Sequence, residues 1–510
     1  MKRTKKLKKG LLVLLSVFLA VGAFSGCSQG EKKTSKMGTH IKWMVPGDHF
    51  SPADEAEVFK AYNDKLSQIL PDVEVEIELV PFGDYAQRHQ LTLSAKEDVD
   101  ILWTGYLLSY ITEATNGSYL ALNDLLEEHA PDMLKEIPQW AWDKQSLNGN
   151  IYSVPNMQQV ANEGKALFFQ TEQGKKYMDR EKLEKILNKE KIMTREGWDA
   201  IGNYLEKLKQ NGELKKGVST SSIPSMLGNM RSDQIVDNFV ILYGEEDIKV
   251  WHLYETPEQQ LMYDVMAEWY KKGYIVEDVA SLESPNQYEF EEDGNILWAH
   301  NYFKDIEKGQ QKSGRPWVDA LGIKGMGPII GMGDSATASA IVSYSPDSVA
   351  AIKVLDLMNT KKGADLFNTL AFGIEGKQYN LKEGRMSPVR DEQELPLYQI
   401  NRWELGNVFN GYELESDPDN WYNYLLTEVQ GPNVGLSPLL GFKPDVSGLS
   451  TELAHIRAVE GEYYRSLCDG ALPDHKATYA EMMDKLKTAG LDKVKAELQS
   501  QIDKWLAENK

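Results

Sequence analysis

Apolar and polar positions alternate between a strand period and a helix period over the first hundred residues of the folded region. Short apolar or alternating runs predict strands at Ile41–Pro46, Val73–Leu79 and Asp100–Trp103. Between them, Pro52–Leu70 and Asp84–Ser94 carry apolar residues at helical spacing. A strand–helix–strand–helix–strand order is typical of a parallel α/β sheet, so this fold class is expected for the chain.

Polar and aromatic side chains follow two of these strands where the strands end. Asp48 and His49 come after the first strand, and Trp103 and Tyr106 lie at the end of the third. Ligands of open α/β sheets gather beyond the carboxyl ends of the strands. These four residues are therefore candidate ligand contacts.

Farther along, the pattern predicts two strands that cross between two bodies. The stretch 156–163, which begins with Asn156, is polar in its middle and apolar on both sides, and small residues precede an apolar run at 335–342. A strand at Ile296–Ala299 is expected to end at His300, so that Trp298 and Asn301 lie at a strand exit, and Trp403 and Asn407 lie in an aromatic loop region. Amphipathic helices are predicted for Thr451–Gly470 and Lys476–Asn509.

The N-terminus has the pattern of a secretory signal. A lysine-rich leader precedes the apolar run Leu11–Phe24, which is too short to cross a bilayer comfortably. Phe24-Ser25-Gly26-Cys27 resembles a bacterial lipobox, which would place a lipid on Cys27. The polar stretch from Ser28 to Gly38 suits a flexible tether.

Composition narrows the possible functions. The 510 residues carry a formal charge of −21, which disfavours binding to nucleic acid or to an anionic membrane surface. The two cysteines are Cys27 and Cys468, and a lipid on Cys27 would leave no pair for a disulfide. We expect no cofactor and no metal site.

The chain also lacks a convincing catalytic motif. G-x-S-x-G occurs once, at 26–30, but it straddles the proposed lipidation site and has no strand before it. Close acidic pairs are expected by chance among 77 acidic residues, so we expect no enzyme. The 12 tryptophans and 24 tyrosines are more informative, because aromatic faces cover the C–H patches of sugars while Asp and Asn bind the hydroxyls. Three pairs combine both ingredients or extend the aromatic surface: Trp103/Tyr106, Trp298/Asn301 and Trp403/Asn407.

Taken in order, several stretches resemble the extracellular solute-binding proteins of carbohydrate ABC importers, in a lipoprotein branch with a C-terminal helical extension. The stretches that carry this resemblance are Cys27, Asp98–Trp103, Gly149–Pro155, Gly294–Trp298, Ala338–Asn359, Phe372–Tyr379, Ser437–Phe442 and Ala489–Leu506. The resemblance implies a two-lobe, maltose-binding-like (type II) α/β fold that closes around an oligosaccharide and delivers it to permease subunits. It also implies Asp48 and His49 as a polar ligand loop, Trp103 and Trp298 as stacking tryptophans, and Trp403 as a further platform. Tyr106 stands where the family pattern has an acidic residue, which leaves the particular sugar open.

The implied organisation is a signal peptide at 1–26, a tether at 27–38 and two discontinuous lobes. The first lobe is 39–158 with 340–405, and the second is 159–339 with 406–510. The expected protein is a monomer, held by its lipid on the outer face of the cytoplasmic membrane. A receptor for a non-sugar solute such as a peptide, a surface glycan hydrolase and a structural or sensory partner remain alternatives. Trp298→Ala is expected to weaken ligand binding and to leave the fold intact.

Overall fold

The computed structural model describes residues 38–49, 51–105, 108, 110–284, 286, 288–289, 291–312, 314–332 and 337–509. The predicted signal peptide, the predicted lipidation site Cys27 and Tyr106 lie outside these residues. Residues 39–510 form one compact unit by their contacts, apart from the N-terminal segment. Within the described part, no helix has both the length and the apolar character needed to cross a membrane.

The first sheet confirms the parallel strands predicted near the N-terminus. Its strand order is β2-β1-β3-β14-β6, with β1 parallel to β2 and β3, and with β14 antiparallel to β3 and β6. The strands are β1 (Thr39–Pro46), β2 (Val73–Val80), β3 (Ile101–Thr104), β6 (Val154–Pro155) and β14 (Ala338–Ile341). Because β14 enters and β6 leaves at the carboxyl end of β3, both crossing segments start from the edge where a ligand is expected.

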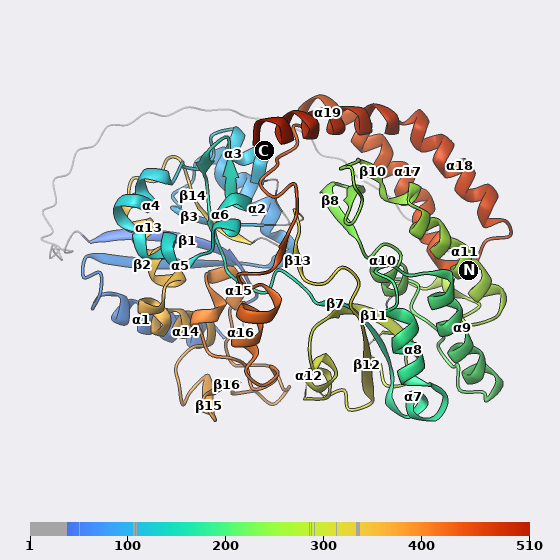
Figure 1. The fold of residues 1–510 in the computed structure, drawn as a ribbon. Helices are drawn as coiled ribbons and strands as arrows, with labels where there is room; N and C mark the ends of the chain where they lie inside the picture. Colours follow the sequence, from blue (N-terminus) through green and yellow to red (C-terminus); the bar gives the residue numbers. More distant parts are fainter. Residues whose placement is uncertain are drawn as a thin grey trace, which may run out of the picture. The chain divides into compact units, whose positions relative to one another are not determined.

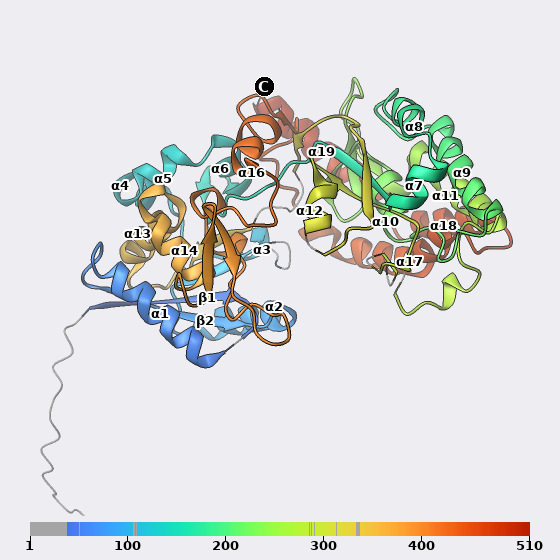
Figure 2. The same cartoon turned by 90° about the horizontal axis from the view of Figure 1, so that it is seen from below.

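Helices and two hairpins complete the first hydrophobic core around this sheet (Figures 1 and 2). They are α1 (Pro52–Leu66), α2 (Phe82–Ala95), α3 (Tyr110–Thr115), α4 (Asn123–His129), α5 (Pro131–Glu136), α6 (Gln139–Gln145), β4 (Ser146–Leu147), β5 (Asn150–Ile151), α13 (Ser348–Asn359), α14 (Ala364–Phe372), β15 (Tyr379–Lys382), β16 (Arg385–Pro388) and α15 (Arg402–Leu405). Helix α1 starts at Pro52 because Ser51 caps it, accepting a hydrogen bond from the Asp54 N–H at 3.4 Å. The first core therefore combines residues from both halves of the chain, and it extends to Val408.

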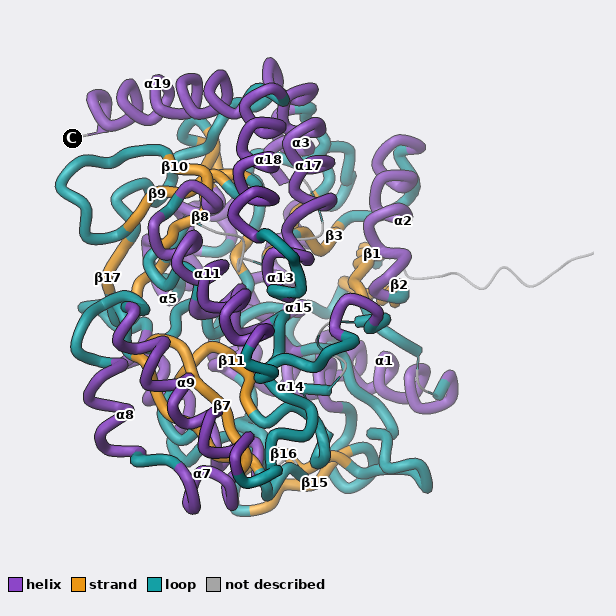
Figure 3. Tube along the Cα trace, turned by 90° about the vertical axis from the view of Figure 1, so that its right-hand side faces the viewer, coloured by secondary structure: helices purple, strands orange, loops and turns teal. Residues whose placement is uncertain are grey.

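A second hydrophobic core surrounds two antiparallel sheets, β11-β7-β12 and β10-β9-β8 (Figure 3). Its elements are β7 (Gly164–Gln170), α7 (Thr171–Tyr177), α8 (Arg180–Leu187), α9 (Arg195–Gln210), α10 (Ser222–Leu227), β8 (Ser232–Val236), β9 (Phe239–Leu242), β10 (Trp251–His252), α11 (Pro257–Lys271), β11 (Leu297–Tyr302), α12 (Ile306–Lys312), β12 (Val318–Ile323), α17 (Ser450–Asp469), α18 (His475–Thr488) and α19 (Leu491–Asn509). The predicted tail helix Lys476–Asn509 is two helices, because Gly490 turns the chain with a φ of +107°. The mixed α/β class is thus confirmed, although these sheets are antiparallel.

The strand predicted to end before His300 continues to Tyr302. Each residue of β11 pairs with β7, from Leu297 opposite Phe169 to Tyr302 opposite Gly164. The change from apolar to polar residues at His300 suggested that the strand ends there. An edge strand that turns one polar face to solvent gives the same pattern.

One peptide group in the returning crossing segment is bonded to both cores. After β13 (Ile329–Ile330), the carbonyl of Gly331 accepts a hydrogen bond from Lys144 Nζ at 3.0 Å. The N–H of Met332, in the same peptide group, donates to Asp233 Oδ1 at 2.9 Å. Lys144 belongs to α6 beside the first core, and Asp233 belongs to β8 beside the second.

Candidate functional site

A small hydrophobic cluster joins the segments that run between the two cores. Its buried members come from the outgoing crossing segment, from β13, from α16 (Trp421–Tyr424) and from the π-helix Leu425–Val429. These buried residues are Ala161, Ile330, Trp421, Tyr422, Leu425 and Val429. A π-helix carries one extra residue per turn and is frequent at functional sites, so this junction is a candidate site.

Gln430 ties this junction together through its side-chain amide. Its Oε1 accepts from the Val160 N–H at 3.0 Å, and its Nε2 donates to the Gln158 carbonyl at 2.9 Å. The side chain is buried, so the two bonds are shielded from water. The amide replaces the backbone partner that this stretch of the crossing segment would have in a sheet. The prediction of a strand at 156–163 is therefore wrong. This segment is irregular and is held by a side chain.

A cavity of about 500 Å³ opens beside this junction. It is lined by residues of the outgoing segment, of the loop after β11 and of the stretch around α16: Glu163, Lys304, Asp305, Pro418, Asp419, Asn420, Trp421, Asn423, Tyr424, Thr427 and Glu428. Trp421 and Tyr424 are stacked, with ring centroids 5.6 Å apart and an interplanar angle of 29°. Phe303, which follows β11, also packs against Trp421, with ring centroids 4.8 Å apart.

Four of the residues that line the cavity are acidic. Glu163, Asp305, Asp419 and Glu428 supply carboxylates, and Lys308 pairs with Asp305 at 2.8 Å. The Tyr424 hydroxyl oxygen accepts from the Lys304 N–H at 3.2 Å, and burial, together with the neighbouring Glu163 carboxylate, raises the pKa of Tyr424. Stacked rings beside carboxylates and amides can cover the C–H face of a sugar and bind its hydroxyls.

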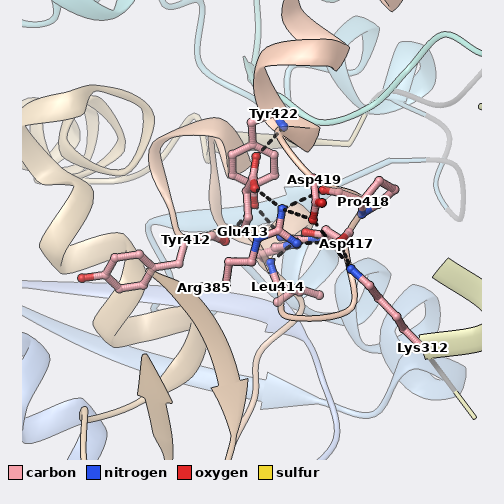
Figure 4. Close-up of polar contacts among 10 residues, drawn as sticks. Lys312, Arg385, Tyr412, Glu413, Leu414, Asp417, Pro418, Asp419 and Tyr422 are labelled. Atoms are coloured by element: carbon pink, nitrogen blue, oxygen red, sulfur yellow. Dashed lines mark hydrogen bonds and ion pairs between the residues drawn. The ribbon is translucent and has the colours of Figure 1, made fainter. Parts of the chain in front are cut away.

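The stretch that precedes α16 is held by an arginine from the β15–β16 hairpin (Figure 4). Arg385 donates to the carbonyl oxygens of Asp417 and Pro418, at 2.7 and 2.9 Å, and to Glu413 Oε2 at 3.1 Å. Glu413 Oε1 accepts in turn from the Tyr422 N–H at 2.7 Å. The wall of the cavity is therefore connected to the first core through this network.

Trp103 and Trp403, two of the predicted platforms, lie together at the carboxyl edge of the first sheet. Their ring centroids are 6.2 Å apart, and Phe82 packs on both. Trp103 is fully buried, and Gly105 makes room for its ring, since a Cβ there would lie 2.7 Å from Trp103 Cζ2. Trp403 is partly exposed. We call this set of rings the closed aromatic cluster: Phe82, Tyr85, Trp103 and Trp403.

Two of the predicted polar ligand contacts near this cluster, Asn156 and His49, contact other groups of the protein. Asn156 Nδ2 donates to the carbonyls of Trp403 and Glu404, at 3.2 and 2.9 Å. His49 is exposed, with Nδ1 2.9 Å from Glu55 Oε2, and Asp48 is exposed beside it.

Glu404 is a titratable residue that the sequence analysis missed. It is fully buried, Asn401 donates to its Oε1 at 3.0 Å, and its Oε2 has no hydrogen-bond partner among the described residues. Burial, with a smaller contribution from Asp48, raises the pKa of Glu404 to about 8. Its position within Arg402-Trp403-Glu404-Leu405, between two apolar side chains, was the available signal.

The structure does not bring Trp298 into the same cluster as Trp103. Trp298 is 3% exposed and stacks on Phe168 across the β11–β7 pair, with centroids 5.6 Å apart. It belongs to a small cluster on one face of the β11-β7-β12 sheet. A ligand contact by Trp298 stays a prediction, and so does an intact fold in Trp298→Ala, although this burial implies that the variant loses stability.

The two remaining predicted contacts also have partners within the protein. Asn301 Oδ1 accepts from Lys165 Nζ at 2.8 Å. Asn407 is 8% exposed, and its side chain accepts from the Phe409 N–H at 3.1 Å, which caps a short helical turn. Ligand binding by either residue stays a prediction.

The aromatic pair at the cavity was missed although its sequence offered a signal. Trp421-Tyr422-Asn423-Tyr424 follows the turn-forming stretch Asp417–Asn420, so three rings and an amide emerge from one loop. These rings begin a short helix, whereas the predicted ligand contacts lie at strand exits.

The fold is that of the extracellular solute-binding proteins. The crystal structure of an N-glycan transport solute-binding protein from Streptococcus pneumoniae matches with a TM-score of 0.76 and 22% identity, covering 92% of this chain and 100% of that chain. An ABC-transporter-associated solute-binding protein from Bifidobacterium longum infantis, described as binding human milk oligosaccharides (HMO), matches with a TM-score of 0.65 and 15% identity, covering 92% of this chain and 99% of that one.

At the level of sequence, the chain is 24% identical over 532 residues to a carbohydrate ABC transporter substrate-binding protein of Streptococcus pneumoniae serotype 4, with 100% of both chains covered. Residues 438–507 match a family model described as a domain of unknown function, DUF3502. These similarities confirm the predicted resemblance to the substrate-binding proteins of carbohydrate ABC transporters.

Proposed function

We propose that this protein is the substrate-binding protein of a carbohydrate ABC importer, and that it captures an oligosaccharide in the cavity beside α16. The observation that carries this proposal is the stacked Trp421–Tyr424 pair, which borders a cavity with carboxylate and amide groups at the junction of the crossing segments. Rings and acceptors in this combination suit a neutral, hydroxyl-rich ligand.

The two cores correspond to two lobes of a type II binding protein. We place the first lobe at 39–158 with 340–405 and the second at 159–339 with 406–510. Packing of Val408, Tyr412 and Leu414 on the first core favours a boundary a few residues later than 405. A ligand that binds the closed arrangement more tightly than the open one is sufficient to drive closure.

The rest of the assignment follows from the same class of protein. Cys27 would carry the lipid, residues 27–38 would tether the folded part outside the membrane, and the loaded protein would deliver its ligand to permease subunits. It would work as a monomer, without enzymatic activity and without nucleic acid.

Calorimetry with a panel of oligosaccharides tests the proposal. The panel should include mannose–N-acetylglucosamine glycans, milk oligosaccharides and fructo-oligosaccharides, because the complexes or descriptions of similar proteins name them. We expect saturable binding of at least one class and a raised unfolding midpoint, since a ligand at 100 times its Kd stabilises the folded state by about 2.7 kcal/mol.

Three results would contradict the proposal. Binding of peptides with no response to any glycan would indicate a non-sugar receptor. Release of shorter products from labelled oligosaccharides would indicate a hydrolase, and a complete lack of ligand stabilisation would favour a structural or sensory role.

A further inference from the structure

Arg385 lies outside the cavity, yet it holds the loop that forms part of the cavity wall (Figure 4). It is the first residue of β16, where its backbone pairs with Lys382 of β15. Its side chain is 17% exposed, and the two terminal nitrogens contact four oxygens of one loop. These oxygens are the carbonyls of Asp417 and Pro418, Glu413 Oε2 at 3.1 Å and Asp419 Oδ1 at 3.5 Å.

This loop is acidic, and Arg385 is one of several cations that pair with it. Glu413, Glu415, Asp417 and Asp419 place four carboxylates within seven residues, and like charges at this spacing repel each other. Arg385 meets two of the carboxylates and two carbonyls at once, which a planar guanidinium with five N–H donors can do. An ammonium group is a point charge with three donors, so lysine would satisfy only part of the set.

The bonds continue from this loop to the stacked rings. Glu413 accepts from Arg385 with one oxygen and from the Tyr422 N–H with the other, at 2.7 Å. Tyr422 lies between Trp421 and Asn423, which both line the cavity. Asn420, directly before Trp421, has a left-handed backbone with a φ of 59°, so the direction in which the chain enters α16 is unusual and must be held.

We propose that Arg385 is a positioning residue for ligand binding, acting through Glu413 on the orientation of Trp421 and Tyr424. This inference rests on the proposed function for the identity of the ligand. Arg385 touches no ligand itself; it fixes the wall before the ligand arrives, which lowers the ordering cost of binding.

The experiment compares Arg385→Gln and Arg385→Lys with a matched control, Arg390→Gln. Arg390 is an exposed arginine of the same region, and it bonds to the Glu394 carbonyl rather than to the cavity wall. Calorimetry with the glycan that the wild-type protein binds should show about tenfold weaker binding for Arg385→Gln, an intermediate value for Arg385→Lys and no change for Arg390→Gln. An Arg385→Gln affinity equal to that of the wild type would overturn the inference.

A double-mutant cycle separates positioning from a general loss of stability. Combined with Trp421→Phe, Arg385→Gln should weaken binding by less than the product of the two single effects, because both changes act on the same ring. Fully multiplicative effects would show that Arg385 does not act through Trp421.

Hydrogen exchange provides a test that needs no ligand. In the ligand-free protein, Arg385→Gln should speed amide exchange at 414–424 and leave the strands of the first sheet unchanged, whereas Arg390→Gln should change neither. Unchanged exchange at 414–424 would overturn the inference even if the wild type bound no glycan. A wild-type protein that bound no glycan would refute only the proposed function.

Discussion

The closed aromatic cluster and the stacked pair Trp421–Tyr424 both stand beside carboxyl groups, and a cavity borders the second of them. In the closed aromatic cluster, Trp103 is fully buried and the nearby Glu404 is sealed from solvent, with a pKa raised to about 8. Around the stacked pair Trp421 and Tyr424, by contrast, carboxylates border a cavity of about 500 Å³. A ring and an acid at the end of a strand therefore do not define a sugar site. The proposed site differs in the cavity beside its rings.

The largest effect that this contrast predicts is on stability, at Trp103. Trp103→Ala should lower the free energy of unfolding by about 3–5 kcal/mol, because it empties a fully buried ring position in the first core. Denaturant unfolding monitored by circular dichroism measures this loss. Trp298→Ala should lower stability on the same scale, for the same reason.

Trp251→Ala serves as the matched control, since Trp251 is only half-buried and packs against Lys249 at the surface. We expect a clearly smaller loss of stability for it. A Trp103→Ala protein that is as stable as the wild type but binds no glycan would reverse the contrast and make the closed aromatic cluster the ligand site.

The next effect concerns pH and Glu404. The folded protein retains the proton of Glu404 up to a pKa of about 8, whereas the unfolded chain loses it near 4.5. Raising the pH between these values therefore lowers the stability of the wild type relative to Glu404→Gln, by roughly 2–4 kcal/mol at pH 8. Unfolding midpoints of both proteins across this range measure the difference.

Below pH 4.5 the two proteins should have similar stability, because the glutamate is then protonated in both states. Parallel stability curves over the whole range would show that Glu404 is not held neutral. The contrast with the solvent-facing acids of the cavity would then disappear.

At the cavity, the main expected effect is on binding. Tyr424→Ala removes half of the stacked pair and should weaken glycan affinity by at least tenfold, or about 1.4 kcal/mol, with a smaller loss of stability than Trp103→Ala. Calorimetry measures the affinity. Tyr270→Ala, which removes a partly exposed tyrosine of α11, should bind as the wild type does. Equal affinities for both variants would exclude the stacked pair as the platform.

The smallest effect is expected at the acids of the cavity. Glu163→Gln keeps a carbonyl acceptor in place and should weaken binding by about 0.5–1 kcal/mol, since only the stronger, charged hydrogen bond is lost. Glu172→Gln, at an exposed position in α7, is the control. An unchanged affinity for Glu163→Gln would leave the rings, rather than the carboxylates, as the source of affinity.

Local patterns predicted much of the first half of the fold. The three strands and two helices between Ile41 and Trp103 form as expected, because alternation and helical spacing report burial on one face. Helix α9 begins where Thr194 caps it, accepting from the Gly197 N–H at 3.2 Å. These features depend on neighbours within a few residues.

The candidate site depends on residues that are distant in sequence, and here the sequence said less. A strand-exit tryptophan can face a cavity or a partner strand, and only the register that places Trp298 opposite Phe168 decides between them. Likewise, Gln430 finds its partners at 158 and 160, about 270 positions away. No local spacing encodes such contacts. The proposed class of ligand was indicated by the supply of rings and acceptors, which is a matter of composition.

The peptide group between Gly331 and Met332 has a consequence for how such a molecule can bend. Its oxygen accepts a hydrogen bond from Lys144 and its N–H donates one to Asp233, so residues beside both hydrophobic cores bind the same planar group. If the two sides turn relative to each other, this plane acts as a pivot, and the largest displacements occur far from it. The two sides would then rotate about a fixed peptide group that makes no contact with the ligand.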